Sequence, residues 1–265
     1  MQEAKGVYAT QKKNGEPSFR ASITYRNKHI ALGSFGTYEE AAKAYKIAAL
    51  LIRDNARSLE DYKKSWPISY DKVVVLINFR DNGLYTSNPM YVRKNYISYF
   101  LDSETELKFS KDDLFYYMTH RILKRGGHLY VNDFGMQLSL QARYGIKRYA
   151  VPGRDYVFVN GDRYDYRYEN ITVLNMYNGV IYRDGEHKKG YMSKIHDRSD
   201  IVIGYYDDAI KAAIAYNKAI DILHKNGIDK NYEPNYIEGL SPRAYAEIYT
   251  QIPVSRAVYE RGQTR

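Results

Sequence analysis

The sequence predicts an α+β protein in which two small three-stranded antiparallel sheets, each with one helix, flank a central α+β region. Three observations carry this prediction: a segment repeated near both ends, an alanine-rich pattern that closes each copy, and a middle segment of different texture. The chain has 265 residues, enough for two or three small domains. We therefore expect domains at residues 1–65, 66–174 and 175–265, the last with a helical tail.

The repeat relates a segment that begins at Gly6 to one that begins at Gly179. Each copy opens with Gly-Val, passes a polar turn, alternates polar and apolar residues, and reaches a glycine followed two residues later by an aromatic. Eight residues after that glycine both copies read Ala-Ala-x-Ala-Tyr, at 41–45 and 212–216. Alternation with a period of two predicts short strands, and the alanine block predicts a helix. Each copy is thus expected to form three strands and a helix.

The helix of the first copy is expected to begin beside Thr37. Threonine is a good N-cap, and the two glutamates that follow place negative charge at the positive end of the helix dipole. Small side chains at Ala41, Ala44 and Ala48 let this helix lie close against the sheet. We assign these alanines a structural role.

The residues between the two copies are less regular. Lys72–Phe79 and His128–Asp133 predict strands, and Ser110–Lys124 predicts a helix capped by its first residue. Met136–Gly145 predicts a second helix or a turn. The sequence Lys-Arg-Gly-Gly at Lys124–Gly127 is typical of a turn between strands.

The composition favours a polyanionic partner and excludes cysteine chemistry. Forty Lys and Arg against 31 Asp and Glu leave a net charge of +9, a balance typical of proteins that bind polyanions. The excess of positive charge is +3 in residues 1–62, +5 in 63–174 and +1 in 175–265, so it is not confined to one tail. The absence of cysteine excludes disulfides, thiolate zinc sites and cysteine nucleophiles.

Hydropathy gives no sign of a membrane or export segment. The longest apolar runs, Val73–Ile77 and Ala48–Ile52, are far shorter than the roughly 20 residues that span a bilayer. The N-terminus shows no secretory signal. We therefore expect a cytoplasmic protein without a membrane partner.

The repeat resembles the APETALA-type DNA-binding domain of plant ethylene-response factors, which also occurs in phage and mobile-element proteins. In that family a three-stranded sheet, backed by one helix, lies in the major groove of DNA. Phe19 and Tyr191 stand where the family has a tryptophan. The residues that carry the resemblance in the first copy are Gly6-Val7, Phe19-Arg20-Ala21, Ile23, Leu32-Gly33, Phe35 and Glu39–Tyr45, and in the second copy Tyr191, Ser193, Ile195, Gly204, Tyr206 and Ala212–Tyr216.

The resemblance implies double-stranded DNA as the partner, contacted by polar and basic side chains on the exposed strands. A solvated strand face that binds nothing is the alternative. We expect both Arg20→Ala and Arg26→Ala to weaken DNA binding. The candidate contact residues are Thr10, Lys12, Lys13, Arg20, Ser22, Thr24, Arg26 and Lys28 in the first copy, and Arg183, Lys188, Lys189, Lys194, His196 and Arg198 in the second.

The segment directly before the second copy resembles the C-terminal half of an HNH finger, the ββα nuclease element of homing endonucleases, at about residues 146–174. An HNH finger followed by an APETALA-type domain is a known arrangement in phage homing endonucleases. The histidine that acts as general base in the family falls on Phe158, and the central asparagine falls on Tyr166. Phenylalanine cannot deprotonate water. The matching residues are Asn160-Gly161-Asp162, Asp165, Arg167 and Glu169-Asn170-Ile171.

The acidic residues of this segment allow two interpretations. Asn160, Asp162 and Asp165 offer the oxygen ligands that Mg²⁺ prefers. The same residues are typical of a tight turn, in which Arg167 pairs with Asp165 or Glu169. We favour the turn, and we expect no catalytic residue, metal site or cofactor.

A rearranged site would need another base, and His120 and His128 are the nearest histidines before the segment. With such a base the chain would be an active HNH-type homing or nicking endonuclease that uses Mg²⁺.

The sequence thus predicts a degenerate HNH homing-endonuclease relative, encoded by a phage or mobile element, that binds double-stranded DNA in a bacterial host cell without cutting it. A third interpretation is a protein-binding phage factor, such as an inhibitor of a host defence complex. The 30 tyrosines and the nearly neutral C-terminal segment motivate it. The oligomeric state stays open.

Overall fold

The computed structural model describes residues 5–147, 150–185 and 188–262. These residues form two compact units, Met1–Leu140 with Asp162–Asn170, and Gln141–Gly161 with Ile171–Arg265. Both units mix helices with small antiparallel sheets, which confirms the predicted α+β class. No helix in the described part of the chain is long and apolar enough to cross a membrane.

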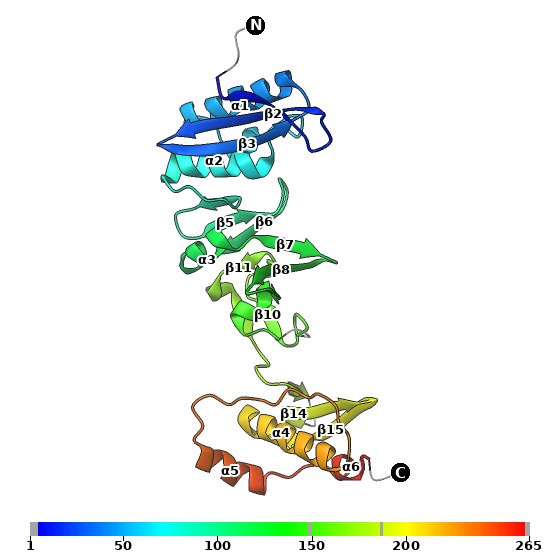
Figure 1. The fold of residues 1–265 in the computed structure, drawn as a ribbon. Helices are drawn as coiled ribbons and strands as arrows, with labels where there is room; N and C mark the ends of the chain where they lie inside the picture. Colours follow the sequence, from blue (N-terminus) through cyan, green and yellow to red (C-terminus); the bar gives the residue numbers. More distant parts are fainter. Residues whose placement is uncertain (1–4, 148–149, 186–187, 263–265) are drawn as a thin grey trace. The chain divides into compact units, whose positions relative to one another are not determined.

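The first copy of the repeat folds as three strands and a helix, as predicted. The strands β1 (Val7–Gln11), β2 (Pro17–Tyr25) and β3 (Lys28–Phe35) form an antiparallel sheet in chain order. The helix α1 (Tyr38–Arg53) covers one face of this sheet (Figure 1). The other face carries two of the candidate DNA-contacting side chains in exposed positions, those of Arg20 and Thr24.

Helix α1 begins and packs as the sequence predicts. The Thr37 hydroxyl accepts a hydrogen bond from the Glu40 amide at 3.2 Å, which caps the helix. Ala41, Ala44 and Ala48 are completely buried. Their small side chains allow α1 to lie close to the sheet.

The glycine that opens each copy is required by a close approach. Gly6 has φ +82°, and a Cβ there would collide with the ring of Tyr45 and with a carbonyl of β2. Gly179 has φ +69°, and a Cβ there would collide in the same way with Tyr216 and a strand carbonyl. The glycine and the tyrosine of the repeated motif therefore form one packing unit in both copies.

The predicted strand at Lys72–Phe79 is wrong, because these residues lie in helix α2 (Tyr70–Asn82). Ser69 caps the helix start, and Gly83 ends it in the left-handed conformation. Every residue from Val73 to Arg80 is buried. A helix that is buried on all sides has the same continuous apolar run as a buried strand, so periodicity does not separate the two.

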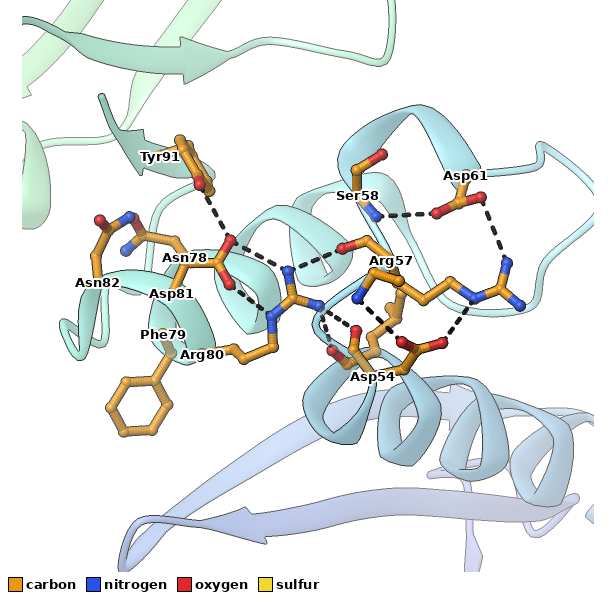
Figure 2. A network of polar contacts seen from close by, with 12 residues as sticks. Asp54, Arg57, Ser58, Asp61, Asn78, Phe79, Arg80, Asp81, Asn82 and Tyr91 are labelled. Carbon is orange, nitrogen blue, oxygen red and sulfur yellow. Dashed lines mark hydrogen bonds and ion pairs between the residues drawn. The ribbon is translucent and has the colours of Figure 1, made fainter. Parts of the chain in front are cut away.

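Helix α2 is joined to α1 by the buried side chain of Arg80, which is 4% exposed (Figure 2). Its guanidinium donates to the carbonyls of Leu51 at 2.7 Å and of Asp54 and Arg57 at 2.8 Å, at and just beyond the end of α1. Asp81 accepts from Arg80 Nε at 2.6 Å. Carbonyls at a helix C-terminus lack partners within the helix and favour a cation. The core therefore continues past residue 65, the predicted end of the first domain.

A second sheet of the first unit has the order β11-β6-β5-β4. Its strands are β4 (Met90–Val92), β5 (Ile97–Phe100), β6 (Glu106–Phe109) and β11 (Asp165–Tyr166). The pairing of β11 with β6 is parallel, whereas the other pairs are antiparallel. The chain thus returns from the second unit to complete this sheet.

The predicted helix at Ser110–Lys124 is shorter than expected. The structure has a 3-10 turn η2 (Lys111–Asp113), the helix α3 (Leu114–Thr119) and then a strand β7 (Ile122–Arg125). The first amide of β7 donates to the buried hydroxyl of Tyr99 at 2.9 Å. This contact and the pairing with the next strand replace the hydrogen bonds of a longer helix.

Strand β7 forms a third antiparallel sheet with β8 (His128–Asp133) and β9 (Met136–Ser139). The strand predicted at His128–Asp133 and the turn at the glycine pair before it are confirmed. The helix considered for Met136–Gly145 is instead β9 followed by a 3-10 helix η3 (Leu140–Tyr144). Pairing with β8 favours the extended conformation there.

The second copy of the repeat also has the predicted three strands and helix. The antiparallel strands are β13 (Val180–Gly185), β14 (Lys188–Asp197) and β15 (Ser199–Tyr206), and the helix is α4 (Ala209–Lys225). A short hairpin of β10 (Tyr156–Phe158) and β12 (Ile171–Val173) precedes them, with the 3-10 helix η4 (Tyr168–Asn170) between.

The C-terminal tail closes the open edge of the second copy. Helices α5 (Pro242–Gln251) and α6 (Arg256–Glu260) pack against α4. Between them Ser255 donates from its amide to the Ile203 carbonyl at 2.8 Å and from its hydroxyl to the Val202 carbonyl at 2.6 Å. The edge of β15 is thereby covered.

We expect Arg80→Ala to lower the free energy of unfolding of the first unit by about 3 kcal/mol, because three carbonyls and one carboxylate lose a buried partner. Urea denaturation measures the change. Arg57→Ala is the matched control: its ion pairs, both at 3.4 Å, are half-exposed, and its loss should cost about 0.5 kcal/mol. Equal effects of the two substitutions would contradict the central role of Arg80.

Candidate nucleic-acid interface

The face of the β1-β2-β3 sheet that points away from α1 presents a row of polar side chains across all three strands. In the register of the sheet Tyr8 lies opposite Arg20, and Arg20 lies opposite Ser34. Side chains directly opposite in an antiparallel sheet share a face. A second pair on this face, Thr24 and His29, lies nearer the β2-β3 turn. All five residues are exposed.

The segment that forms this sheet has more basic than acidic residues. Residues 5–36 contain six Lys and Arg but a single acidic residue, Glu16. Glu16 lies in the β1-β2 turn, where it pairs with Lys12 at 2.8 Å. Within the described residues the guanidinium of Arg20 has no ion-pair partner. Arg20 is therefore free to bind an anion.

Two of the predicted contact residues, Arg26 and Lys28, are engaged within the fold. Arg26 lies in the tight β2-β3 turn, and its Nη1 donates to the Phe79 carbonyl of α2 at 3.2 Å. Its guanidinium also lies 5.1 Å from the ring centroid of Tyr25. The ammonium of Lys28 lies 4.8 Å from the ring centroid of Tyr85. The structure thus directs both cations toward α2 and the segment after it.

The remaining candidates of the first copy differ in exposure. Lys13 is exposed in the β1-β2 turn. Ser22 is buried, and the Thr10 hydroxyl, which is half-buried, donates to the Ser18 carbonyl at 3.3 Å. Sequence reasoning missed Tyr8, which is 58% exposed beside Arg20. The alternation of β1, which places Tyr8 and Thr10 on one face, was the available signal.

The second copy has the same backbone but a different row of side chains. Ile181, Met192 and Tyr205 lie opposite one another where the first copy has Tyr8, Arg20 and Ser34. Ile181 and Met192 are buried. The central position of this sheet therefore offers an apolar thioether in place of a guanidinium.

A carboxylate binds two candidates of the second copy. Asp200 accepts hydrogen bonds from Lys194 at 2.5 Å and from the ring of His196 at 2.9 Å. The hydrogen bond from Lys194, followed by that from His196, lowers the pKa of Asp200. Asp200 is consequently ionised at neutral pH, and these two side chains already have an anionic partner.

The other candidates of the second copy lie at strand ends. Lys189 is 3.9 Å from Asp184, whereas Arg183 and Arg198 are exposed. The side chain of Lys188 lies outside the described residues. Residues 179–206 contain five basic and four acidic side chains, so this sheet lacks the charge excess of the first.

The two positions that correspond to the HNH base and asparagine carry aromatic residues in structural contacts. Phe158 lies in β10 opposite Ile171. Tyr166 is buried in β11 and stacks on Phe109 with ring centroids 5.6 Å apart. Phe158 belongs to the second compact unit and Tyr166 to the first.

The described residues 150–174 contain no α-helix, so the helix of the expected ββα element is not formed there. Asn175, which is buried, lies shortly after β12. Its Nδ2 donates a hydrogen bond to the Asp155 carboxylate at 3.0 Å. Its Oδ1 accepts from the amide of Tyr182 in β13 at 3.1 Å. These two bonds connect the segment after β12 to β13, the first strand of the second copy of the repeat.

The acidic residues of this segment pair with cations of the protein. Asp162 accepts from Lys108 at 3.0 Å, a bond that raises the pKa of Lys108. Asp165 is fully buried and binds Arg167 through two hydrogen bonds of 2.8 and 2.6 Å. Arg167 also lies 3.0 Å from Glu169. The predicted turn and the pairing of Arg167 are confirmed.

The described residues hold no group of three or more His, Asp or Glu side chains placed to bind a metal ion. His120, considered as a substitute base, has Nδ1 2.9 Å from the Tyr116 carbonyl and Nε2 3.4 Å from Asp133. It links the end of α3 to the end of β8. His128 is exposed at the β7-β8 turn.

Comparisons of the chain with protein-family models, with curated proteins and with solved structures find no match. The resemblances described above therefore depend on the quoted residues alone.

We expect Arg26→Gln to lower the free energy of unfolding by about 1 kcal/mol, because it removes the hydrogen bond to Phe79 and the contact with Tyr25. Arg20→Gln is the matched control on the same strand-turn segment and should change stability by less than about 0.5 kcal/mol. Urea denaturation of both variants measures the difference. A larger loss for Arg20 would show that its side chain serves the fold.

Proposed function

We propose that the protein binds double-stranded DNA through the exposed face of the β1-β2-β3 sheet and does not cut it. The observation that carries this proposal is the unpaired Arg20, placed between Tyr8 and Ser34 on a sheet face without carboxylates. Arginine serves both phosphate contacts and base-edge contacts to guanine. Tyrosine and serine add hydrogen-bond donors of the kind that contact phosphates.

In the family that the repeat resembles, a three-stranded sheet of this kind lies in the DNA major groove, which is roughly 12 Å wide. Thr24 and His29 extend the polar row toward one end of β2, and Lys13 lies at the other end. Such a surface makes several phosphate contacts along one groove. Its affinity should depend strongly on salt, since each neutralised phosphate releases counterions.

The absence of cleavage is supported by the residues at the HNH-like segment. Phe158 has no group that could act as a base or a metal ligand, and Tyr166 is buried with its ring stacked on Phe109. Asp162 and Asp165 are paired with cationic side chains. We infer that the chain descends from an HNH homing endonuclease of a phage or mobile element. It would act in the cytoplasm of a bacterial host, and binding would need no cofactor.

A second candidate function, protein binding, is favoured by the second copy of the repeat. Val202 and Tyr205 are exposed on the face of that sheet, next to the charges that Asp200 neutralises. An apolar and nearly neutral sheet face suits a protein partner, such as a host defence complex, better than DNA.

Fluorescence anisotropy with a labelled random duplex tests DNA binding. We expect affinity to fall at least tenfold between about 50 and about 200 mM salt, and Arg20→Gln to reduce the slope of log affinity against log salt by about one. Lys194→Gln, which removes the same charge from a pair with Asp200, is the control and should leave the slope almost unchanged. Lack of binding by the native protein at both salt concentrations would refute the proposal.

Supercoiled plasmid tests cleavage. Incubation with Mg²⁺ or Mn²⁺ at a high excess of protein should leave the plasmid supercoiled, because the base position is Phe158. Nicking that disappears in a His120→Ala variant would instead establish a rearranged nuclease site.

Pull-down from nuclease-treated bacterial lysate tests the second candidate. A partner that is retained after nuclease treatment and released by Tyr205→Asp would establish protein binding through the second copy. Loss of every partner on nuclease treatment would leave DNA as the ligand.

A further inference from the structure

The turn between β8 and β9 holds a phenylalanine whose placement does not serve the fold. Phe134 is 96% exposed. It adopts φ +45°, in the left-handed region, followed by Gly135 at φ +79°. Asp133 and Met136 pair on either side, so Phe134 and Gly135 are the two central residues of a tight hairpin turn.

Folding alone would favour another residue at this position. Two-residue turns with positive φ favour Asn, Asp or Gly, and a bulky side chain there is an outlier. The ring of Phe134 is exposed, so it buries no apolar surface that would compensate for the backbone strain. The neighbouring Met136 is 61% exposed as well. Strain combined with exposure points to a role outside the fold.

The β8-β9 hairpin that carries Phe134 is fixed by contacts with other parts of the first unit. Asp133, the residue before Phe134, lies 3.4 Å from Nε2 of His120 at the end of α3. Val131 of β8 is buried opposite Ile122 of β7. The turn therefore projects from a packed sheet.

One face of the same sheet has polar side chains at both ends, on either side of the half-buried pair Leu123 and Tyr130. Asn132 and Gln137 are exposed and lie opposite each other, one ladder step from the turn, and Arg125 and His128 are an exposed pair at the far end. Side-chain amides pair with adenine and arginine pairs with guanine or phosphate. Residues 121–140, the part of this segment that belongs to the first unit, contain three Lys and Arg and one acidic residue, Asp133, which contacts His120. Arg121 pairs with Asp71 at 3.2 Å, which leaves Lys124 and Arg125 as the exposed cations. The charge favours a polyanion over an acidic or neutral protein surface.

We propose that the β8-β9 turn is an apolar wedge: when the protein binds duplex DNA, Phe134 inserts between neighbouring base pairs and kinks the helix. This inference rests on the proposed DNA binding and adds a second contact element to it. Apolar side chains inserted at a base step unstack it and bend the duplex by roughly 20–90°. Asn132 and Gln137 lie where they can contact base edges beside the opened step.

The test measures DNA bending with the full chain. A duplex of about 30 base pairs, far shorter than the persistence length of DNA, carries a donor dye at one end and an acceptor at the other. A second duplex set carries 2-aminopurine, which fluoresces more strongly when unstacked, at successive positions. The native protein should raise energy transfer and increase 2-aminopurine fluorescence at one step of a bound site.

Phe134→Asn is the main variant, because asparagine fits the turn without strain and removes the wedge. It should melt no lower than the native protein and keep salt-sensitive binding, but lose both signals. Phe134→Leu, which retains an apolar wedge, should keep roughly half or more of the energy-transfer change. Phe115→Ala is the matched control, since Phe115 on α3 is also an exposed phenylalanine of the first unit and should leave both signals unchanged.

Arg20-dependent binding without any change in energy transfer would overturn the wedge and leave the proposed function intact. Bending that is the same in the native protein and in Phe134→Asn would overturn it as well. Lack of duplex binding at low salt would refute both proposals together.

Discussion

The first unit depends on the buried guanidinium of Arg80. It satisfies the carbonyls at the end of α1, including those of Leu51 and Asp54, while the backbone of Arg80 belongs to α2. An arginine can do this because its planar fork offers several donors and remains charged when buried. The two helices are thereby joined, and the exposed side chains of the sheet lie on the face opposite α1. A lysine would supply one point charge for three carbonyls and would leave part of the network unpaired.

A comparison of the two copies of the repeat distinguishes the residues that the fold requires from the exposed residues that could bind a ligand. Both keep a glycine that approaches a helix tyrosine, Gly6 with Tyr45 and Gly179 with Tyr216, because this contact sets the distance between strand and helix. The open faces have diverged. Arg20 in the first copy is replaced by a buried methionine in the second, and carboxylates there neutralise the nearby cations. A common backbone therefore presents one surface suited to an anion and one that is nearly neutral.

The HNH-like segment contributes to the packing of both units. Tyr166 stacks on Phe109 in the sheet of the first unit, and Asp165 is buried with Arg167 as its partner. Removing the charge of Arg167 would leave the carboxylate of Asp165 buried without compensation, which is costly. The ion pair thus has a structural role in the first unit. By contrast, the strained and exposed Phe134 has no such role, and this difference separates a residue that serves the fold from one available for binding.

The sequence by itself determined the repeated sheet-and-helix units, the cap at Thr37 and the turn at Asn160-Gly161-Asp162, because these depend on local periodicity, capping and turn chemistry. It misassigned Lys72–Phe79, since a continuous apolar run fits a buried helix and a buried strand equally. It also grouped Arg26 with Arg20, although strand alternation says nothing about what packs beside a turn. Only the tertiary structure decided that Arg26 contacts α2 while Arg20 stays free. The physical reason is that the exposure and the charge pairing of a side chain depend on residues distant in sequence. A local sequence pattern contains no information about these distant residues.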